Sequence, residues 1–308
     1  MEKVLGFNEL ITILCGIVMG TIARIITLRV DTRQNPSYPT GCFINIVIGT
    51  LASALGAVAI PALLGREFTA VTFIGVAIQH FREVRKTEKS SLEDLEKTEY
   101  SKRGAAYIDG IAKTYESRNY ISMVTSFFVV LILTIFSLDS ILINIILAGI
   151  SGSLCIYLLE KITKGKCIGD ICEIRQGTLS IDHSDLLVDN MFVTSVLGTE
   201  RSRELFLNEG VGFIIKPKSN KFRITLENYG QRQAMLFEAT RTFGMKRYGF
   251  TRKNYSKGVI ILAFVPIIHD TDAIINVIKE TPVLENSRKI NTINYLTEDY
   301  SWSRVTFS

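Results

Sequence analysis

Four long apolar runs, all before residue 162, limit what this chain can fold into more than any other feature. They cover residues 10–28, 42–64, 121–138 and 141–159. Arg24 is the one charged residue inside them, and Asp139 lies between the last two. A helix of about 20 residues is long enough to cross about 30 Å of hydrocarbon. The sequence therefore predicts an integral membrane protein, multi-pass in the cell membrane, with about four transmembrane helices.

The segments between these runs predict how the helices are connected. Two prolines and a glycine between Arg33 and Gly41 prevent a continuous helix and indicate a turn. Asp139 and Ser140 alone separate the last two runs, which is typical of a tight helical hairpin. A further apolar piece, Phe68–Ile78, is too short to span, and we interpret it as a re-entrant or interfacial helix, with a buried soluble helix as the alternative.

Basic residues near the apolar runs predict the orientation. Residues 82–118 contain nine Lys/Arg and residues 161–175 contain four more. Short loops rich in Lys and Arg stay on the cytoplasmic side of a membrane. We therefore expect both segments, and with them the carboxy terminus, to be cytoplasmic, although Arg29 and Arg33 in the first hairpin oppose this orientation.

The change of character along the chain predicts four regions. The first transmembrane hairpin and the short apolar piece occupy residues 1–81, and a charged helical linker in the cytoplasm follows at 82–120. The second transmembrane hairpin takes residues 121–164, and a soluble cytoplasmic α+β domain takes 165–308.

Periodicity and capping residues predict the elements of this last region. Strand and helix patterns alternate, so we expect a compact α+β fold, with a ferredoxin-like arrangement as one candidate. The expected elements are a helix from Thr199 to Gly210, strands Val211–Lys216 and Phe222–Leu226, a helix from Asn228 to Phe243, a strand Val259–Val265 and a helix Thr271–Glu280.

Small residues recur along the apolar runs. Without side chains in the way, helix backbones approach closely and gain dispersion contacts. The glycines expected at such packing seams are Gly16, Gly20, Gly49 and Gly56. The seams lie either within one chain or between copies, so the sequence is compatible with both a monomer and a homo-oligomer. Arg24 is expected to extend to the lipid headgroups, and the lack of acidic residues in mid-run disfavours active transport.

Charge and cysteine usage exclude several classes of function. The chain of 308 residues has a formal charge of +5 but no Lys/Arg run, so we expect contact with membrane lipid and no nucleic-acid binding. Cys167 and Cys172 lie close together in sequence, but the three histidines are scattered. The sequence therefore predicts reduced thiols, no metal site and no cofactor.

No catalytic motif is present in the sequence, so we expect no enzyme. His269, Asp270 and Asp272 stand at a strand-to-helix turn, where an aspartate usually caps the helix. Gln231, Arg232 and Gln233 fall on the first turn of a predicted helix. They form an anion site at the helix end, a solvated face or a patch that docks a partner, and the last two are favoured.

A hexapeptide at residues 107–112 has two faces on a helix. Ile108, Ile111 and Ala112 form an apolar face, while Asp109 is spaced to pair with Lys113. Gly110 in the middle of a helix costs about 1 kcal/mol relative to alanine, which predicts a close backbone contact or a bend. The hexapeptide consists of Tyr107, Ile108, Asp109, Gly110, Ile111 and Ala112.

This hexapeptide resembles the namesake motif of the YIEGIA family of membrane proteins from endospore-forming Firmicutes, with Asp109 in place of glutamate. Further resemblance covers residues 33–39, 56–63, 230–234 and 281–285. The resemblance implies a sporulation-associated membrane protein with no established reaction or ligand.

These observations together favour an assembly or scaffold component without catalysis, whose cytoplasmic part docks protein partners through the hexapeptide or through Gln231, Arg232 and Gln233. The alternative is an oligomeric channel or transport component in which Phe68–Ile78 re-enters the bilayer. The oligomeric state distinguishes the two, because a pore with few polar residues needs several copies around an axis.

Overall fold

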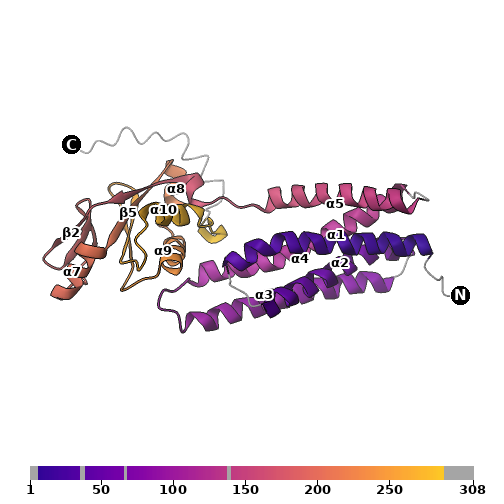
Figure 1. Cartoon of the computed structure of the whole chain (residues 1–308), viewed down its shortest axis with the longest axis horizontal. Coiled ribbons are helices and arrows are strands. Elements are labelled where there is room, and N and C mark those ends of the chain that lie inside the picture. The colour runs from indigo at the N-terminus through magenta and orange to yellow at the C-terminus, as the bar shows by residue number, and fades with distance from the viewer. Residues whose placement is uncertain (1–5, 35–38, 66–67, 137–139, 288–308) are drawn as a thin grey trace. The chain divides into compact units, whose positions relative to one another are not determined.

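The computed structural model describes residues 6–34, 39–65, 68–136 and 140–287 (Figure 1). Contacts divide the chain into two compact units. We call residues 1–92 and 111–164 the helical unit, and residues 93–110 and 165–308 the mixed unit. Helix α4 begins in the mixed unit and continues in the helical unit. Residues 107–110 of the hexapeptide therefore belong to the mixed unit, and Ile111 and Ala112 belong to the helical unit.

The helical unit contains long helices joined by short connections. They are α1 (Phe7–Gln34), α2 (Pro39–Leu64), α3 (Phe68–Glu96), α4 (Ala105–Phe136) and α5 (Ile141–Thr163). Within the described residues, α1, α2, α4 and α5 each contain a stretch long and apolar enough to cross a membrane. The four predicted transmembrane helices are therefore confirmed in their length and apolar composition.

Two boundaries differ from the sequence prediction. The short apolar piece Phe68–Ile78 is the first part of the continuous helix α3, which runs on through the charged residues to Glu96. The hexapeptide likewise belongs to the same helix as the third apolar run, because α4 extends unbroken from Ala105 to Phe136. A change in composition marks where a helix changes environment, and it does not require the helix to end.

The glycines of the apolar helices lie where helices approach closely. A Cβ atom added at Gly20 would stand 2.5 Å from Ser53 Oγ and 2.6 Å from the backbone oxygen of Ser122. At Gly16 it would stand 2.5 Å from Val130 Cγ2, and at Gly56 it would overlap the backbone of α4. These seams join α1, α2 and α4 within one chain.

Arg24 does not extend to the headgroups as predicted. Its side chain is 1% exposed, and Nε donates a hydrogen bond to the backbone oxygen of Asn45 at 3.3 Å. Gly49 makes room for it, since a Cβ there would lie 2.7 Å from Arg24 Cβ. The missing side chain of Gly49 therefore allows a buried arginine between α1 and α2.

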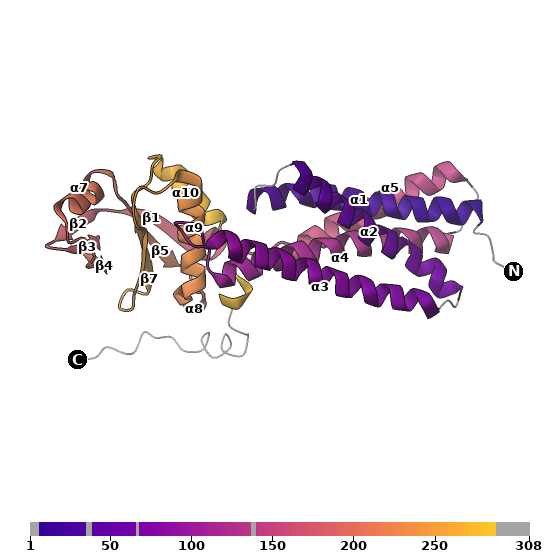
Figure 2. The same ribbon diagram turned by 90° about the horizontal axis from the view of Figure 1, so that it is seen from below.

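The mixed unit is built on an antiparallel sheet of four strands in the order β1-β5-β7-β6, and a second sheet has the order β2-β3-β4. Its elements are α6 (Ile168–Ile171), β1 (Cys172–Gly177), β2 (Leu179–Asp182), β3 (Asp185–Val188), β4 (Met191–Thr194), α7 (Glu200–Glu209), β5 (Val211–Pro217), α8 (Asn220–Glu227), α9 (Tyr229–Phe243), β6 (Phe250–Asn254), β7 (Val259–Phe264), α10 (Thr271–Glu280) and the 3₁₀ turn η1 (Glu285–Ser287). In Figure 2, α8, α9 and α10 lie on one side of the larger sheet, and α7 with β2, β3 and β4 on the other.

Both faces of the larger sheet are covered, which explains the uninterrupted apolar strands at its centre. All six residues of β7 are buried. Ile260, Leu262 and Phe264 pack with α9 and α10, whereas the alternate residues Val259 and Ile261 pack with the second sheet and α7. A strand buried on both faces has an apolar run in place of an alternating pattern.

The predicted α+β class is confirmed, and most of its predicted elements are present. Helices α7, α9 and α10 begin after Thr199, Asn228 and Asp270, whose side chains accept hydrogen bonds from the first turns. The expected strand Phe222–Leu226 is wrong, because these residues lie in α8. The element order also differs from the βαββαβ order of a ferredoxin-like domain.

Candidate functional site

The segments that carry the family resemblance in the mixed unit meet at one place. The first turns of α4 (residues 105–110), helix α9 and the segment 281–287 contact one another, and we call this the motif junction. A Cβ added at Gly230, on the first turn of α9, would stand 2.7 Å from Ala106 Cβ. One added at Gly110 would lie 3.7 Å from Leu284 Cδ2. The junction therefore joins three parts of the chain that are far apart in sequence.

The start of α4 is set by the loop before it. Gly104 has φ 86°, a conformation that suits glycine, and its carbonyl accepts hydrogen bonds from the amides of Tyr107 and Ile108. The Gly104 amide donates to Glu96 Oε1 at 2.8 Å. This arrangement ends the preceding turn and begins α4 directly at the hexapeptide.

Tyr107 is the hexapeptide side chain that reaches α9. It is 2% exposed, its ring meets Phe237 edge-on with centroids 6.2 Å apart, and its hydroxyl donates a hydrogen bond to Glu238 Oε1. Glu238 also pairs with Arg241 at 2.8 Å. The tyrosine thus combines an apolar contact with a charge-assisted hydrogen bond.

The other hexapeptide residues show the two faces that the sequence predicts. Ile108, Ile111 and Ala112 are each at most 1% exposed. Asp109 and Gly110 are half-buried. The close contact predicted for Gly110 is not present, because the nearest non-local atom to an added Cβ is at ordinary van der Waals distance. Gly230 has the tight contact instead.

Gln231 connects α9 to the segment 281–287. It is fully buried, and its amide nitrogen donates to the Pro282 carbonyl at 3.0 Å. Its amide oxygen accepts from the Leu284 amide at 2.8 Å and from the Ser287 hydroxyl at 3.2 Å. Both polar atoms of this glutamine are therefore used inside the chain.

Its two neighbours face other surroundings. Gln233 donates from Nε2 to the Lys102 carbonyl at 2.7 Å. Arg232 lies over the ring of Tyr229 with 5.5 Å between its Cζ and the ring centroid, and partial burial lowers the pKa of its guanidinium. The predicted triplet is therefore divided: Gln231 and Gln233 hold backbone segments, and Arg232 lies on an aromatic ring.

Arg103, which the sequence analysis did not select, completes the junction. It is 4% exposed and lies over Phe237 with 4.7 Å between Cζ and the ring centroid, and it pairs with Glu99 at 3.6 Å. Nearby, the Thr240 hydroxyl donates to Ser101 Oγ at 2.9 Å. The basic residue stands four positions before Tyr107, and no periodicity in the sequence separates it from the other charged residues of that segment.

The remaining candidate residues lie elsewhere. Gly16, Gly20, Gly49 and Gly56 belong to the helical unit and are not part of the junction. Asp270 caps α10 through its bond to the Ala273 amide at 3.0 Å. Among the described residues, no three His, Cys, Asp or Glu side chains are grouped so that they could hold a metal ion.

The two neighbouring cysteines have separate structural places. Cys167 precedes α6, and its backbone pairs with that of Pro282 in an isolated antiparallel β-bridge. Cys172 is 2% exposed in the core between the sheet and the helices. Burial raises the pKa of the Cys172 thiol to about 12. A thiol in this state behaves as a small apolar group.

Comparison with known proteins gives a consistent relationship over nearly the whole chain. The sequence profile of the family described as YIEGIA protein matches residues 12–293. The Bacillus subtilis (strain 168) protein named "Uncharacterized protein YphB" is 34% identical over 287 residues, which cover 91% of this chain and 94% of that protein. No solved structure matches. The chain belongs to the YIEGIA family.

Proposed function

We propose that this protein is a sporulation-associated membrane component that acts as an assembly or scaffold protein without catalysis. The observation that carries the proposal is the motif junction: Tyr107 of the hexapeptide bonds to Glu238 on α9, and Gln231 on α9 bonds to the backbone of Pro282 and Leu284. A scaffold needs a fixed surface, and this network fixes one by joining the hexapeptide, α9 and the segment 281–287.

The bonding pattern supports a structural use of these residues. A residue that acts on a substrate must present an unoccupied donor, acceptor or nucleophile to it. The Tyr107 hydroxyl bonds to Glu238, and the Gln231 amide bonds to Pro282, Leu284 and Ser287. These groups serve the fold of the mixed unit in the described structure.

The proposal places the mixed unit in the cytoplasm, where it docks protein partners, and the four apolar helices in the cell membrane in contact with lipid. Support comes from the basic residues of segments 82–118 and 161–175, and from the sporulation association that the family resemblance implies. The exposed surface around the junction, which includes Tyr229 at 67% exposed, is the proposed docking area.

A specific observation favours an oligomeric channel as the second candidate. On α4, Asn119 is 1% exposed and Ser122 is fully buried, and Asn119 Oδ1 and Ser122 Oγ have no hydrogen-bond partner among the described residues. Polar groups inside an apolar bundle often mark a path for water or ions. The mass of the purified protein in mild detergent tests this candidate: a monomer would exclude it.

Complementation tests the leading proposal. In a Bacillus subtilis strain that lacks YphB, we expect fewer heat-resistant spores and normal vegetative growth, with recovery when this chain is expressed. Asp109→Asn should still restore spores, because an i, i+4 pair with Lys113 on a helix contributes only about 0.2–0.5 kcal/mol to stability. Loss of spores with Asp109→Asn, while the protein accumulates in the membrane, would give the carboxylate a ligand-binding or chemical role and contradict the scaffold.

A further inference from the structure

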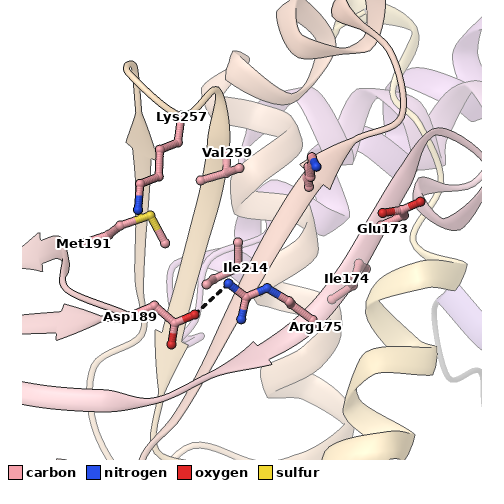
Figure 3. A pocket seen from close by; sticks show the side chains of 9 residues that line it. Glu173, Ile174, Arg175, Asp189, Met191, Ile214, Lys257 and Val259 are labelled. Atoms are coloured by element: carbon pink, nitrogen blue, oxygen red, sulfur yellow. Dashed lines mark ion pairs between the residues drawn. The ribbon is translucent and has the colours of Figure 1, made fainter.

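A cavity of about 420 Å³ lies in the mixed unit on the face of the larger sheet opposite α9 (Figure 3). Strands β1, β5 and β7 form one wall, and the turn between β3 and β4 forms another. The size is within the range of about 300–1,000 Å³ found for pockets that bind small molecules. The motif junction uses the other face of this sheet, so the cavity is a separate feature.

The floor of the cavity is apolar. Met191, Ile214 and Val259 line it, and all three belong to the buried cluster between the two sheets. Each is at most 6% exposed, so the floor is part of a packed core and keeps its shape. A ligand that binds here can bury an apolar body against these three side chains.

One side of the rim is fixed by an ion pair between the two sheets. Arg175 on β1 pairs with Asp189 at 2.7 Å, as Figure 3 shows. Asp189 also accepts hydrogen bonds from the Thr178 amide at 2.7 Å and the Thr178 hydroxyl at 2.9 Å. The Thr178 amide contributes most to lowering the pKa of Asp189, with Arg175 assisting. The Asp189 carboxylate is therefore fully used in bonds to Thr178 and Arg175, and it holds the Arg175 guanidinium at the rim.

The other charges at the rim leave one cation in excess. Lys216, Lys257 and Arg175 line the cavity together with the carboxylates of Glu173 and Asp189. Glu173 lies directly opposite Lys216 in the β1–β5 register. Lys257 has no ion-pair partner among the described residues, and its side chain extends toward Met191 at the floor (Figure 3).

From this arrangement we infer that the cavity binds a small organic anion with a single negative group and an apolar body. The body lies on Met191, Ile214 and Val259, and the anionic group meets Lys257 at the rim, which Arg175 also lines. A charge-assisted hydrogen bond to a lysine at the edge of an apolar floor selects such a ligand over an inorganic anion, which gains nothing from the floor.

Fluorine NMR of the full chain in mild detergent tests this inference with two probes, 4-fluorobenzoate and 4-fluorophenyl phosphate. We expect saturable line broadening with at least one probe. Lys257→Glu should weaken that binding at least about tenfold, because it replaces the attraction by repulsion at the anionic group. Acetate should compete at least about tenfold less well than unlabelled benzoate, because it lacks the apolar body.

Lys253→Glu on the same hairpin is the matched control. It makes the same change in net charge outside the cavity, so it should leave binding within about twofold of the unchanged chain. The inference is overturned if neither probe binds saturably, if Lys257→Glu binds as well as the unchanged chain, or if Lys253→Glu weakens binding as much as Lys257→Glu does.

Discussion

Gly230 and Ala106 approach so closely that a Cβ atom on the glycine would stand 2.7 Å from the Cβ of the alanine. Side-chain carbon atoms do not come this close without displacement of one element. The first turn of α9 and the first turn of α4 therefore depend on the missing side chain at position 230. Leu284 lies near the same glycine, at 4.0 Å from the added atom.

Gly230→Ala should destabilise the mixed unit although alanine favours helices. We expect a net loss of up to about 2 kcal/mol, since overpacking costs about 1–3 kcal/mol and the helix propensity gained offsets about 1 kcal/mol of it. Thermal unfolding of the full chain in detergent measures it. Gly110→Ala is the matched control on α4, because a Cβ fits there, and it should be neutral or stabilising. Equal effects of the two changes would contradict the close approach at Gly230.

Tyr107→Phe should lower the free energy of unfolding by about 1–3 kcal/mol, because it removes the hydroxyl that donates to the Glu238 carboxylate and leaves that acceptor without its partner. Glu238→Gln should cost less, since its amide oxygen still accepts from the hydroxyl. Hydrogen exchange of residues 93–110, read by mass spectrometry, reports the docking of this segment. Faster exchange in Glu238→Gln than in Tyr107→Phe would oppose the proposed role of the hydroxyl.

Gln231→Leu should detach the segment 281–287 from α9. The leucine fills the space but leaves the Leu284 amide and the Pro282 carbonyl without their partner, at about 1–3 kcal/mol for each buried group. We expect faster hydrogen exchange and faster proteolysis at Leu284. Gln233→Leu, whose bond to the Lys102 carbonyl is at the surface, serves as the control and should leave Leu284 protected.

Cys172 should resist alkylation at mildly alkaline pH, while Cys167 is modified. The thiolate is the reactive form, and a pKa raised to about 12 keeps Cys172 protonated until the pH approaches that value. Reactivity therefore increases with pH but stays far below that of an ordinary thiol. Mass spectrometry after iodoacetamide treatment of the folded chain, with a sample in denaturant as control, gives the answer. Rapid modification of folded Cys172 would contradict its burial.

The proposed orientation predicts which sites an impermeant thiol reagent reaches. In a chain with its native cysteines replaced by alanine, Ser90→Cys and Ser256→Cys should be protected in intact cells and labelled after permeabilisation. Both positions are exposed on their own units, so access depends on the membrane alone. Labelling of either in intact cells would place that segment outside.

The sequence was most informative where one physical effect dominates. Runs of apolar residues predicted α1, α2 and α5 because length and hydropathy decide a span. Caps at Thr199, Asn228 and Asp270 predicted three helices correctly, since the capping bond is local.

Other features depend on contacts that a single sequence does not contain. Phe222–Leu226 has a strand-like composition, yet it forms α8 because the helix buries Thr225 and Leu226. The four-residue strands β2, β3 and β4 exist through pairing with one another. The sequence singles out Gly110, in the middle of a helix, as the glycine with a close contact, but the close contact is that of Gly230 with Ala106.

Gln231 joins α9 to the segment 281–287 through a side chain that carries no charge and does not titrate. The connection should therefore persist when pH or ionic strength changes, because screening acts on charges and an amide has none to screen. Arg175 and Asp189, at the rim of the cavity on the other face of the sheet, form a partly exposed ion pair that salt weakens. Ionic conditions can thus alter one face of this sheet while the helices on its other face stay in place.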